Sequence, residues 1–241
     1  MDDSGIPENT VVIGAGGMLG SMVVASLERA GVTVIAADLE GAGFRVNIRS
    51  QDEVREFMLS EVPTDAPGPV GLVVTAGLAV FSDSSERLPT EFSDVFETNV
   101  AGSIWVLNAF EELCRRDKRT GSAVFVSSIY GHFVPDFSIY EHLPRKGSEV
   151  YGASKAALEY LIRYYAVRGG RAGIRVNGVA PGGIQDTGEH SSEFRDAYSR
   201  RTAQGRMVMR SEVVTAIEFL LSHRASGITG QVLAVDAGFG L

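Results

Sequence analysis

The stretch that decides the fold runs Thr10-Val11-Val12-Ile13-Gly14-Ala15-Gly16-Gly17-Met18-Leu19-Gly20. Its first four residues are mostly β-branched and apolar and predict a short buried strand, and an apolar helical period then continues to about Arg29. Gly14 permits a tight turn between the two elements. Gly16 and Gly17 let the backbone approach a pyrophosphate, and Gly20 permits close packing of helix on strand. Backbone N–H groups at the helix N-terminus, those of Met18 and Leu19, would face the anion, so the stretch predicts a dinucleotide-binding turn.

Apolar strands alternate with helical patterns along the rest of the chain. Strands are predicted at 10–13, 32–37, 70–75, 121–127, 174–180 and 229–235, with a further short extended stretch that ends at Asn47-Ile48. Helices are predicted at 51–60, 89–117 and 151–168. A short helix is predicted to begin at about Ser192, and a last helix to end at about Ser222. Ser50 is the predicted N-cap of the helix at 51–60, and Ser211 is that of the last helix. This alternation predicts an α/β protein with a Rossmann-type, doubly wound parallel sheet of about seven strands and helices on both faces.

The domain organisation is expected to be simple. Residues 1–241 form a single dinucleotide-binding domain, with an extended loop at 131–148 and a polar substrate loop at about 185–204. The extended loop holds His132, Pro135, Asp136, Tyr140, His142, Pro144, Arg145 and Lys146.

Asp38 follows the second strand directly. A carboxylate at this place can accept both hydrogen bonds from an adenosine ribose, and it would repel a 2′-phosphate. Residues 38–44 and the glycine turn contain no Arg or Lys that would reverse this preference. The sequence therefore predicts NAD rather than NADP as the cofactor. Small residues after the next strand, Ala76 and Gly77, would let the backbone lie against that cofactor.

A second informative stretch, Tyr151-Gly152-Ala153-Ser154-Lys155, opens an apolar helix. Positions i and i+4 lie on one helix face, so the Tyr151 phenol and the Lys155 ammonium can point into one site. At about 4 Å and an effective dielectric constant of about 20, the cation would favour the phenolate by up to roughly 4 kcal/mol. Because about 1.4 kcal/mol corresponds to one pKa unit, this could bring the tyrosine toward neutrality, where acid–base catalysis is most efficient. Desolvation would oppose part of that shift.

Composition excludes several function classes. The net charge of −8 argues against a binder of nucleic acid or of acidic membranes. The single cysteine, Cys114, cannot form an internal disulfide, and no metal-ligand cluster accompanies it. No apolar signal core or membrane-spanning run is present, so a reduced, cytoplasmic setting without a metal is expected.

Together these features resemble the short-chain dehydrogenase/reductase family along essentially the whole chain. The resemblance is carried by the glycine turn, Asp38, Ala76-Gly77, Asn99-Val100-Ala101-Gly102, Ser128, Tyr151 with Lys155, Pro181-Gly182, and the Val235-Asp236-Ala237-Gly238 ending. Each motif is weak alone, but their shared order is very specific.

The resemblance implies a role for each matched residue. Tyr151 would exchange a proton with the substrate oxygen, and Lys155 would lower the tyrosine pKa and bind the nicotinamide ribose. Ser128 would donate a hydrogen bond to the developing alkoxide, and Asn99 would bend its helix and hold a water in the proton path. The cofactor contacts implied are Gly14, Gly17, Met18, Leu19, Gly20, Asp38, Leu39, Asn47, Ile48, Ala76, Gly77, Tyr151, Lys155, Pro181, Gly182 and Ile184.

The chain also departs from the family pattern. Met18 stands where the compact branch has a third glycine, Val74-Thr75-Ala76-Gly77 replaces Asn-Asn-Ala-Gly, and Asn47 replaces an Asp that often touches adenine. Ser128 precedes Tyr151 by 23 positions, against about 13 in the compact branch. The extended loop at 131–148 and the Pro181-Gly182-Gly183-Ile184 turn look similar to those of family members found in bacterial surface-sugar pathways.

Three functions are therefore considered. The first is an NAD-dependent enzyme that interconverts a secondary alcohol and its carbonyl on a polar substrate, such as a sugar or sugar phosphate. The second is an epimerase or dehydratase that retains NAD, and the third is a sensor that binds NAD(H) without chemistry. A homotetramer or homodimer is expected from the resemblance, and the apolar end from Val232 to Leu241 is consistent with an interface.

Overall fold

The computed structural model describes residues 5–64, 68–82, 84–140, 147–185 and 191–241. Its seven parallel strands form one sheet in the order β3-β2-β1-β4-β5-β6-β7. The strands are β1 (Asn9–Ile13), β2 (Thr33–Asp38), β3 (Phe44–Arg45), β4 (Val70–Val74), β5 (Gly121–Val126), β6 (Ile174–Pro181) and β7 (Val232–Val235). The predicted sheet is confirmed, and its order reverses beside β1, where an open α/β sheet forms its ligand crevice.

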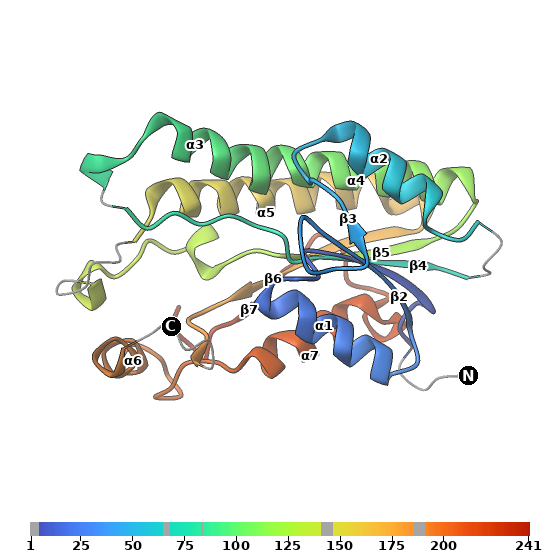
Figure 1. Cartoon of the computed structure of the whole chain (residues 1–241). Helices are drawn as coiled ribbons and strands as arrows, with labels where there is room; N and C mark the ends of the chain where they lie inside the picture. The colour runs from blue at the N-terminus through green and yellow to red at the C-terminus, as the bar shows by residue number, and fades with distance from the viewer. Residues whose placement is uncertain (1–4, 65–67, 83, 141–146, 186–190) are drawn as a thin grey trace.

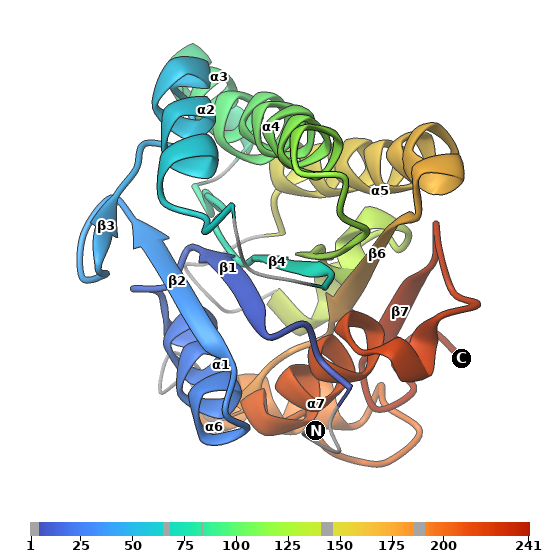
Figure 2. The same cartoon turned by 90° about the vertical axis from the view of Figure 1, so that its right-hand side faces the viewer.

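Helices cover both faces of the sheet (Figure 1). One face carries α2 (Gln51–Ser60), α3 (Pro89–Phe96), α4 (Gly102–Arg116) and α5 (Glu149–Gly169), and the other carries α1 (Met18–Arg29) and α7 (Arg210–Leu221), with α6 (Ser192–Ser199) beside them at one end. Short 3₁₀ turns lie at Ser84–Glu86, Ile129–Gly131, Phe137–Tyr140, Gly170–Ala172 and His223–Ala225. Figure 2 shows the same two layers from the side. None of the helices that the structure describes is long and apolar enough to cross a membrane.

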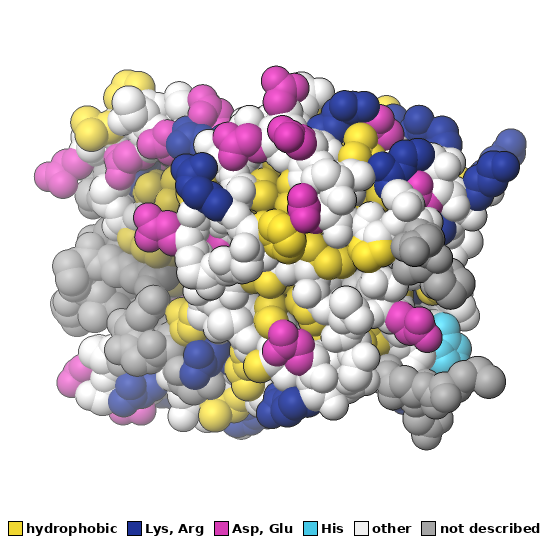
Figure 3. All heavy atoms as spheres, turned by 45° about the vertical axis from the view of Figure 1, so that its right-hand side comes forward, with side chains coloured by type: hydrophobic (Ala, Val, Ile, Leu, Met, Phe, Trp, Pro, Cys, Tyr) yellow, Lys and Arg dark blue, Asp and Glu magenta, His cyan; other side chains and the backbone are white. Residues whose placement is uncertain are grey.

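Each helical layer has its own apolar core against the sheet. Val11, Leu72 and Phe125 are buried under α2, α4 and α5, and Val12 and Val124 are buried under α1 and α7. Alternate residues of one strand thus face opposite layers, which is why the central strands read as continuous apolar runs. The face shown in Figure 3 carries both acidic and basic side chains, so the net charge of −8 is not gathered there into one acidic surface.

The predicted helix at 89–117 is interrupted. Residues Glu97–Ala101 form a π-helical segment between α3 and α4, and Asn99 is buried in it. Asn99 thus lies where the regular α-helical pattern is interrupted, and its expected roles, to bend the helix and to hold a water, stay predictions. Gly102 follows this segment, where a Cβ would lie 2.8 Å from the Ile48 side chain. The helix therefore approaches residue 48 more closely than a larger side chain would allow.

Two local predictions were wrong. Ser211 is not the N-cap of α7, since the helix already begins at Arg210 and Met209 is its N-cap. There the Glu212 carboxylate accepts the Met209 N–H at 2.8 Å, which removes the need for a serine cap. The last strand begins at Val232 rather than Thr229, because the Thr229 hydroxyl and Gly230 N–H are used in contacts with Val176.

Candidate active site

The glycine turn adopts the geometry that its sequence predicts. Gly14 has φ +92°, and a Cβ there would lie 2.3 Å from the Ala76 nitrogen. A Cβ on Gly20 would lie 2.0 Å from the Gly14 carbonyl oxygen, so α1 is pressed onto the turn. Helix α1 begins at Met18, after Gly17, with no side-chain cap and no acidic residue in its first turn. Its N-terminus is therefore suited to an anion such as a pyrophosphate.

Asp38 ends β2 and faces this turn. Its carboxylate accepts N–H groups from Gly16 at 2.9 Å and from Leu39 at 2.6 Å. Asn47 lies further along the same edge, and its side chain accepts the Arg49 N–H at 3.0 Å. The Ile48 side chain is buried. Asp38 thus stands where an acidic residue meets the adenosine ribose in folds of this kind, and contacts of Asn47 and Ile48 with a dinucleotide stay predictions.

Asn99 ties the π-helical segment to the chain that follows β4. Its side-chain oxygen accepts the Leu78 N–H at 2.7 Å, and its amide donates to the Leu78 carbonyl at 2.8 Å and to the Ser154 hydroxyl at 2.9 Å. The side chain thus fixes the segment after Gly77 against α5 by three hydrogen bonds. The Asn99 carbonyl accepts the Ser103 hydroxyl at 2.7 Å.

Tyr151 and Lys155 lie on the first turns of α5. Ser148 caps this helix by accepting the Tyr151 N–H at 3.1 Å. The Lys155 ammonium donates to the Val126 carbonyl at 2.9 Å and lies 5.5 Å from the centre of the Tyr151 ring. Burial lowers the pKa of Lys155 to about 8, although the negative charge of Glu159 acts in the opposite direction. The lysine is therefore held almost fully buried behind the tyrosine.

Ser128 follows β5 and begins the 3₁₀ turn Ile129–Gly131. Its hydroxyl accepts the Tyr130 N–H at 3.2 Å, and the residue is largely buried. A pocket of about 450 Å³ opens beside it. The pocket is lined by Met18, Leu19, Gly77, Ala79, Phe81, Val126, Ser127, Ser128, Ile129, Tyr130, Tyr140, Gly147, Tyr151, Pro181, Gly182, Gly183, Ile184, Phe194 and Tyr198.

Eight of the eighteen site residues that the sequence singled out lie in this lining. Ser128 and Tyr151 share the pocket with Gly77 and with the helix start at Met18 and Leu19. Pro181, Gly182 and Ile184 complete its wall from the end of β6. Asp38, Leu39, Asn47 and Ile48 do not line it, because they belong to the neighbouring edge at β2 and β3. Ala76 and Asn99 also lie outside the lining. Ala76 packs against Gly14, and Asn99 is hydrogen-bonded to Leu78.

The aromatic part of the pocket was missed by sequence reasoning. Tyr130, Tyr140, Phe194 and Tyr198 line it together with Phe81. The Tyr130 and Tyr140 hydroxyls form a hydrogen bond with each other, and the Tyr198 hydroxyl accepts the Gly183 N–H at 2.6 Å. Tyr140 comes from the extended loop at 131–148, and Phe194 and Tyr198 come from the loop at about 185–204, whereas Phe81 and Tyr130 lie outside both.

The charged residues of the extended loop that the structure describes do not line the pocket. The His132 ring pairs with Glu159 at 2.8 Å and does not line the pocket, while Asp136 pairs with Arg201 at 2.8 Å. His142, Pro144, Arg145 and Lys146 lie outside the described residues.

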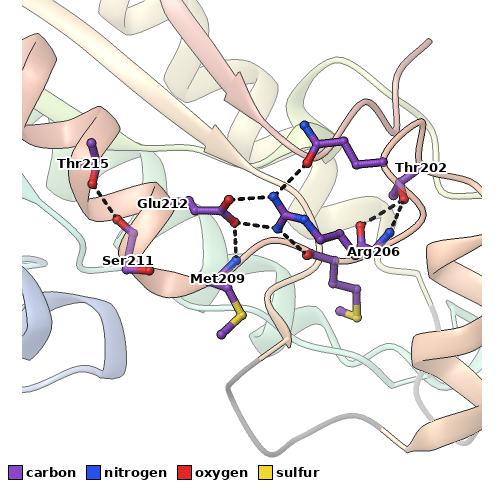
Figure 4. A network of polar contacts seen from close by, with 8 residues as sticks. Thr202, Arg206, Met209, Ser211, Glu212 and Thr215 are labelled. Carbon is purple, nitrogen blue, oxygen red and sulfur yellow. Dashed lines mark hydrogen bonds and ion pairs between the residues drawn. The ribbon is translucent and has the colours of Figure 1, made fainter.

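A polar network holds the segment between α6 and α7 (Figure 4). The Arg206 guanidinium binds the Glu212 carboxylate at 2.7 and 2.8 Å, and Thr202 binds the Arg206 backbone at both its N–H and its carbonyl. Two residues further on, Val208 pairs with Ile184 of the pocket wall in a parallel bridge. The network thus braces the wall from the side of α7.

The fold and this site together define a Rossmann-type dinucleotide-binding protein. Comparison with known proteins specifies its class. The family model described as "Enoyl-(Acyl carrier protein) reductase" matches residues 16–240. The chain belongs to the short-chain dehydrogenase/reductase family and is an oxidoreductase.

Individual relatives cover nearly the whole chain. A galactitol 2-dehydrogenase (L-tagatose-forming) of Cereibacter sphaeroides is 29% identical over 95% of this chain and 93% of its own. A tropinone reductase homologue of Arabidopsis thaliana is 30% identical over 83% of this chain and 73% of its own.

Solved structures agree with the fold. A short chain dehydrogenase from Leptospira borgpetersenii with bound NAD⁺ superposes with a TM-score of 0.87 at 30% identity, covering 97% of this chain and 92% of that one. A sorbitol-6-phosphate 2-dehydrogenase from Erwinia amylovora, at 23% identity, has a TM-score of 0.81 and covers 95% of this chain and 98% of that one.

Proposed function

We propose that this protein is an NAD-dependent oxidoreductase that interconverts a secondary alcohol of a neutral polyol or sugar with the corresponding carbonyl. The observation that carries the proposal is the pocket in which Ser128 and Tyr151 face the helix start at Met18 and the turn at Pro181–Ile184. The proposed cofactor-binding turns and the two proposed catalytic hydroxyls, those of Ser128 and Tyr151, thus line the same pocket.

Each residue of the site has a part in the proposed reaction. In the oxidation direction, Tyr151 takes the proton from the substrate hydroxyl, and in reduction it returns the proton to the carbonyl oxygen. Lys155 stabilises the phenolate by its charge, and Ser128 donates a hydrogen bond to the oxygen that becomes negative. Asn99 keeps the segment after Gly77 against α5 through its bonds to Leu78 and Ser154. When bound, the nicotinamide accepts or supplies the hydride.

The choice of NAD is supported by Asp38. Its carboxylate lies beside the glycine turn, hydrogen-bonded to Gly16 and Leu39, where the ribose of an adenosine would approach. A 2′-phosphate at that place would meet a negative charge at close range. The Leptospira relative, which was solved with NAD⁺, agrees with this choice.

The nature of the pocket supports a neutral, hydroxyl-rich substrate. The lining includes the hydroxyl-bearing residues Ser128, Tyr130, Tyr140 and Tyr198 together with aromatic and aliphatic side chains, and none of the described lining residues is charged. Hydroxyls can bond those of a polyol, while the rings cover its C–H faces. The galactitol dehydrogenase of Cereibacter sphaeroides is a relative named for such a substrate.

The test is NADH formation from NAD⁺ at 340 nm across galactitol, sorbitol, free sugars and simple alcohols, with sorbitol 6-phosphate as the charged comparison. The Tyr151→Phe variant removes the proposed acid–base group, and we expect turnover to fall by about 10²–10⁴-fold. Tyr160→Phe is the matched control, because Tyr160 lies exposed on the same helix. NADH binding, followed by fluorescence, is expected to persist in both variants. Wild-type turnover in Tyr151→Phe would reject the assignment.

A further inference from the structure

Helix α5 carries a third ionisable side chain in register with the proposed catalytic pair. Tyr151, Lys155 and Glu159 are spaced by four residues, which places them along one face of the helix. Glu159 is only 5% exposed. A carboxylate so deeply buried is costly unless it is hydrogen-bonded and paired, so its partners show what it does in the fold.

Glu159 has partners from the end of the neighbouring strand. One carboxylate oxygen accepts the Ser127 hydroxyl at 2.9 Å, and the other contacts the His132 ring nitrogen Nδ1 at 2.8 Å. Gly131 lies between these two residues, and a Cβ there would be 2.4 Å from the carboxylate. Glu159 therefore fastens residues 127–132, which carry Ser128, to the helix that carries Tyr151.

Glu159 also acts on Lys155 through its charge. Around the lysine ammonium lie the Tyr151 ring, the Val126 carbonyl, and the Asn99 amide beyond Gly77. Glu159 is the charged neighbour whose field reaches the lysine and raises its pKa, against the burial that lowers it. On the far side of the carboxylate, His132 is the titratable group, and its ring is 31% exposed.

We propose that Glu159 is a positioning residue that keeps Lys155 protonated beside Tyr151 and holds the Ser128 segment at the right distance from the tyrosine. The proposal rests on the function proposed above for Tyr151, Lys155 and Ser128. If the His132–Glu159 pair had a purely structural role, it would still hold residues 127–132 against α5. Removing the Glu159 charge would then leave the protonation of Lys155 unchanged.

The chain is well suited to a direct test, because it contains three lysines, Lys118, Lys146 and Lys155. Protein labelled with ¹³C at lysine Cε gives one NMR signal for each, and Lys118→Arg and Lys146→Arg assign two of them. In the wild-type protein we expect Lys155 to titrate with a midpoint of about 8. In Glu159→Gln, which keeps the side-chain shape but removes the charge, the midpoint is expected to fall by about one pH unit.

Two further variants sharpen the result. Glu159→Asp keeps a carboxylate and is expected to leave the midpoint closer to that of the wild type than Glu159→Gln does. Glu112→Gln, which removes a surface carboxylate paired with Arg55, is the matched control and is expected to leave Lys155 unchanged. An unchanged Lys155 midpoint in Glu159→Gln would overturn the proposal. A wild-type Lys155 midpoint near 5–6, roughly that of a buried lysine without a counter-charge, would also overturn the proposal. This second outcome is read from the wild-type protein alone, so it does not depend on whether a variant folds.

This measurement needs neither substrate nor cofactor, so it separates the two proposals. If galactitol and the other compounds give no NADH but the Lys155 midpoint shifts, the proposed reaction fails and the role of Glu159 as counter-charge stands. If turnover depends on Tyr151 but the Lys155 midpoint does not respond to Glu159, the reaction stands and the positioning role is rejected.

Discussion

At the scale of single residues, the Asp38 carboxylate orders the backbone of the proposed cofactor site by hydrogen bonds of its own. Its bonds to the Gly16 and Leu39 N–H groups fix the glycine turn relative to the end of β2. Hydrogen bonds to a charged group contribute more than neutral ones, about 1.5–3 kcal/mol each. A bound ribose would add its hydroxyl donors to the same carboxylate.

Replacing Asp38 with Asn is expected to weaken NADH binding by about 10- to 100-fold, because the charge that strengthens these bonds is lost. NADPH binding is expected to weaken less or to improve, since the repulsion of a 2′-phosphate is also lost. Dissociation constants from fluorescence titration measure both effects. Asp236→Asn is a matched control, because Asp236 directly follows strand β7 and also accepts two N–H groups, from Gly238 and Gly240. An unaltered NADH/NADPH preference in Asp38→Asn would rule out this role.

The residues that could be predicted are those whose role is local. Gly14 and Gly20 were identified correctly because a turn between a strand and a helix demands small residues at those places. The contact between His132 and Glu159 was not predicted, because the two residues lie 27 positions apart and no local pattern connects them. Tyr198 was missed for the same reason, since its partner Gly183 lies on a different element.

At the scale of elements, the start of α5 decides where Tyr151 lies. Ser148 caps the helix by accepting the Tyr151 N–H, so the same hydrogen bond begins the helix and fixes the tyrosine backbone. The sequence indicated Ser50 as the cap of α2, and the structure confirms it, but the Ser148 cap was not predicted because it follows an irregular loop. The π-helical segment at Asn99 was predicted only as a bend, since the type of interruption depends on contacts with Leu78 and Ser154.

The two serine caps provide a test of this role. Ser148→Ala and Ser50→Ala are each expected to lower the free energy of unfolding by about 1 kcal/mol, as measured by urea denaturation. Only Ser148→Ala is expected to lower kcat as well, because only that cap holds Tyr151, the proposed acid–base group. Equal kcat values for the two variants would argue that the position of Tyr151 does not depend on its cap.

At the scale of the whole molecule, the loops that follow the carboxyl ends of the strands meet at one end of the sheet (Figure 1). One hydrophobic cluster joins these segments into a wall of the pocket, and it consists of Ile129, Ile139, Tyr140, Phe194, Tyr198, Met207 and Phe239. The doubly wound parallel sheet could be predicted, because an alternating strand–helix chain allows few topologies. The identity of the wall could not, because it depends on which loops meet.

The Arg206–Glu212 ion pair links this wall to α7, and its contribution to the stability of the protein depends on pH. Hydrogen bonds from Arg206 and from the Met209 N–H lower the pKa of Glu212 from 4.5 to about 2. The stabilisation is therefore complete above about pH 4.5 and is lost as the pH falls toward 2. We expect Glu212→Gln to be less stable than the wild type at pH 7, with a smaller difference at pH 3, in urea denaturation. Glu28→Gln, at an exposed position of α1, is the control, and a difference between wild type and Glu212→Gln that does not change with pH would contradict the linkage.

The central claim is that Tyr151 exchanges a proton with a hydroxyl-bearing substrate in an NAD-dependent reaction. Its most direct test is the rate of NADH formation from NAD⁺ and galactitol in the wild type, Tyr151→Phe and Tyr160→Phe. The account predicts turnover in the wild type and in Tyr160→Phe, and a loss of about 10²–10⁴-fold in Tyr151→Phe with NADH binding retained. Equal turnover in all three proteins would contradict it.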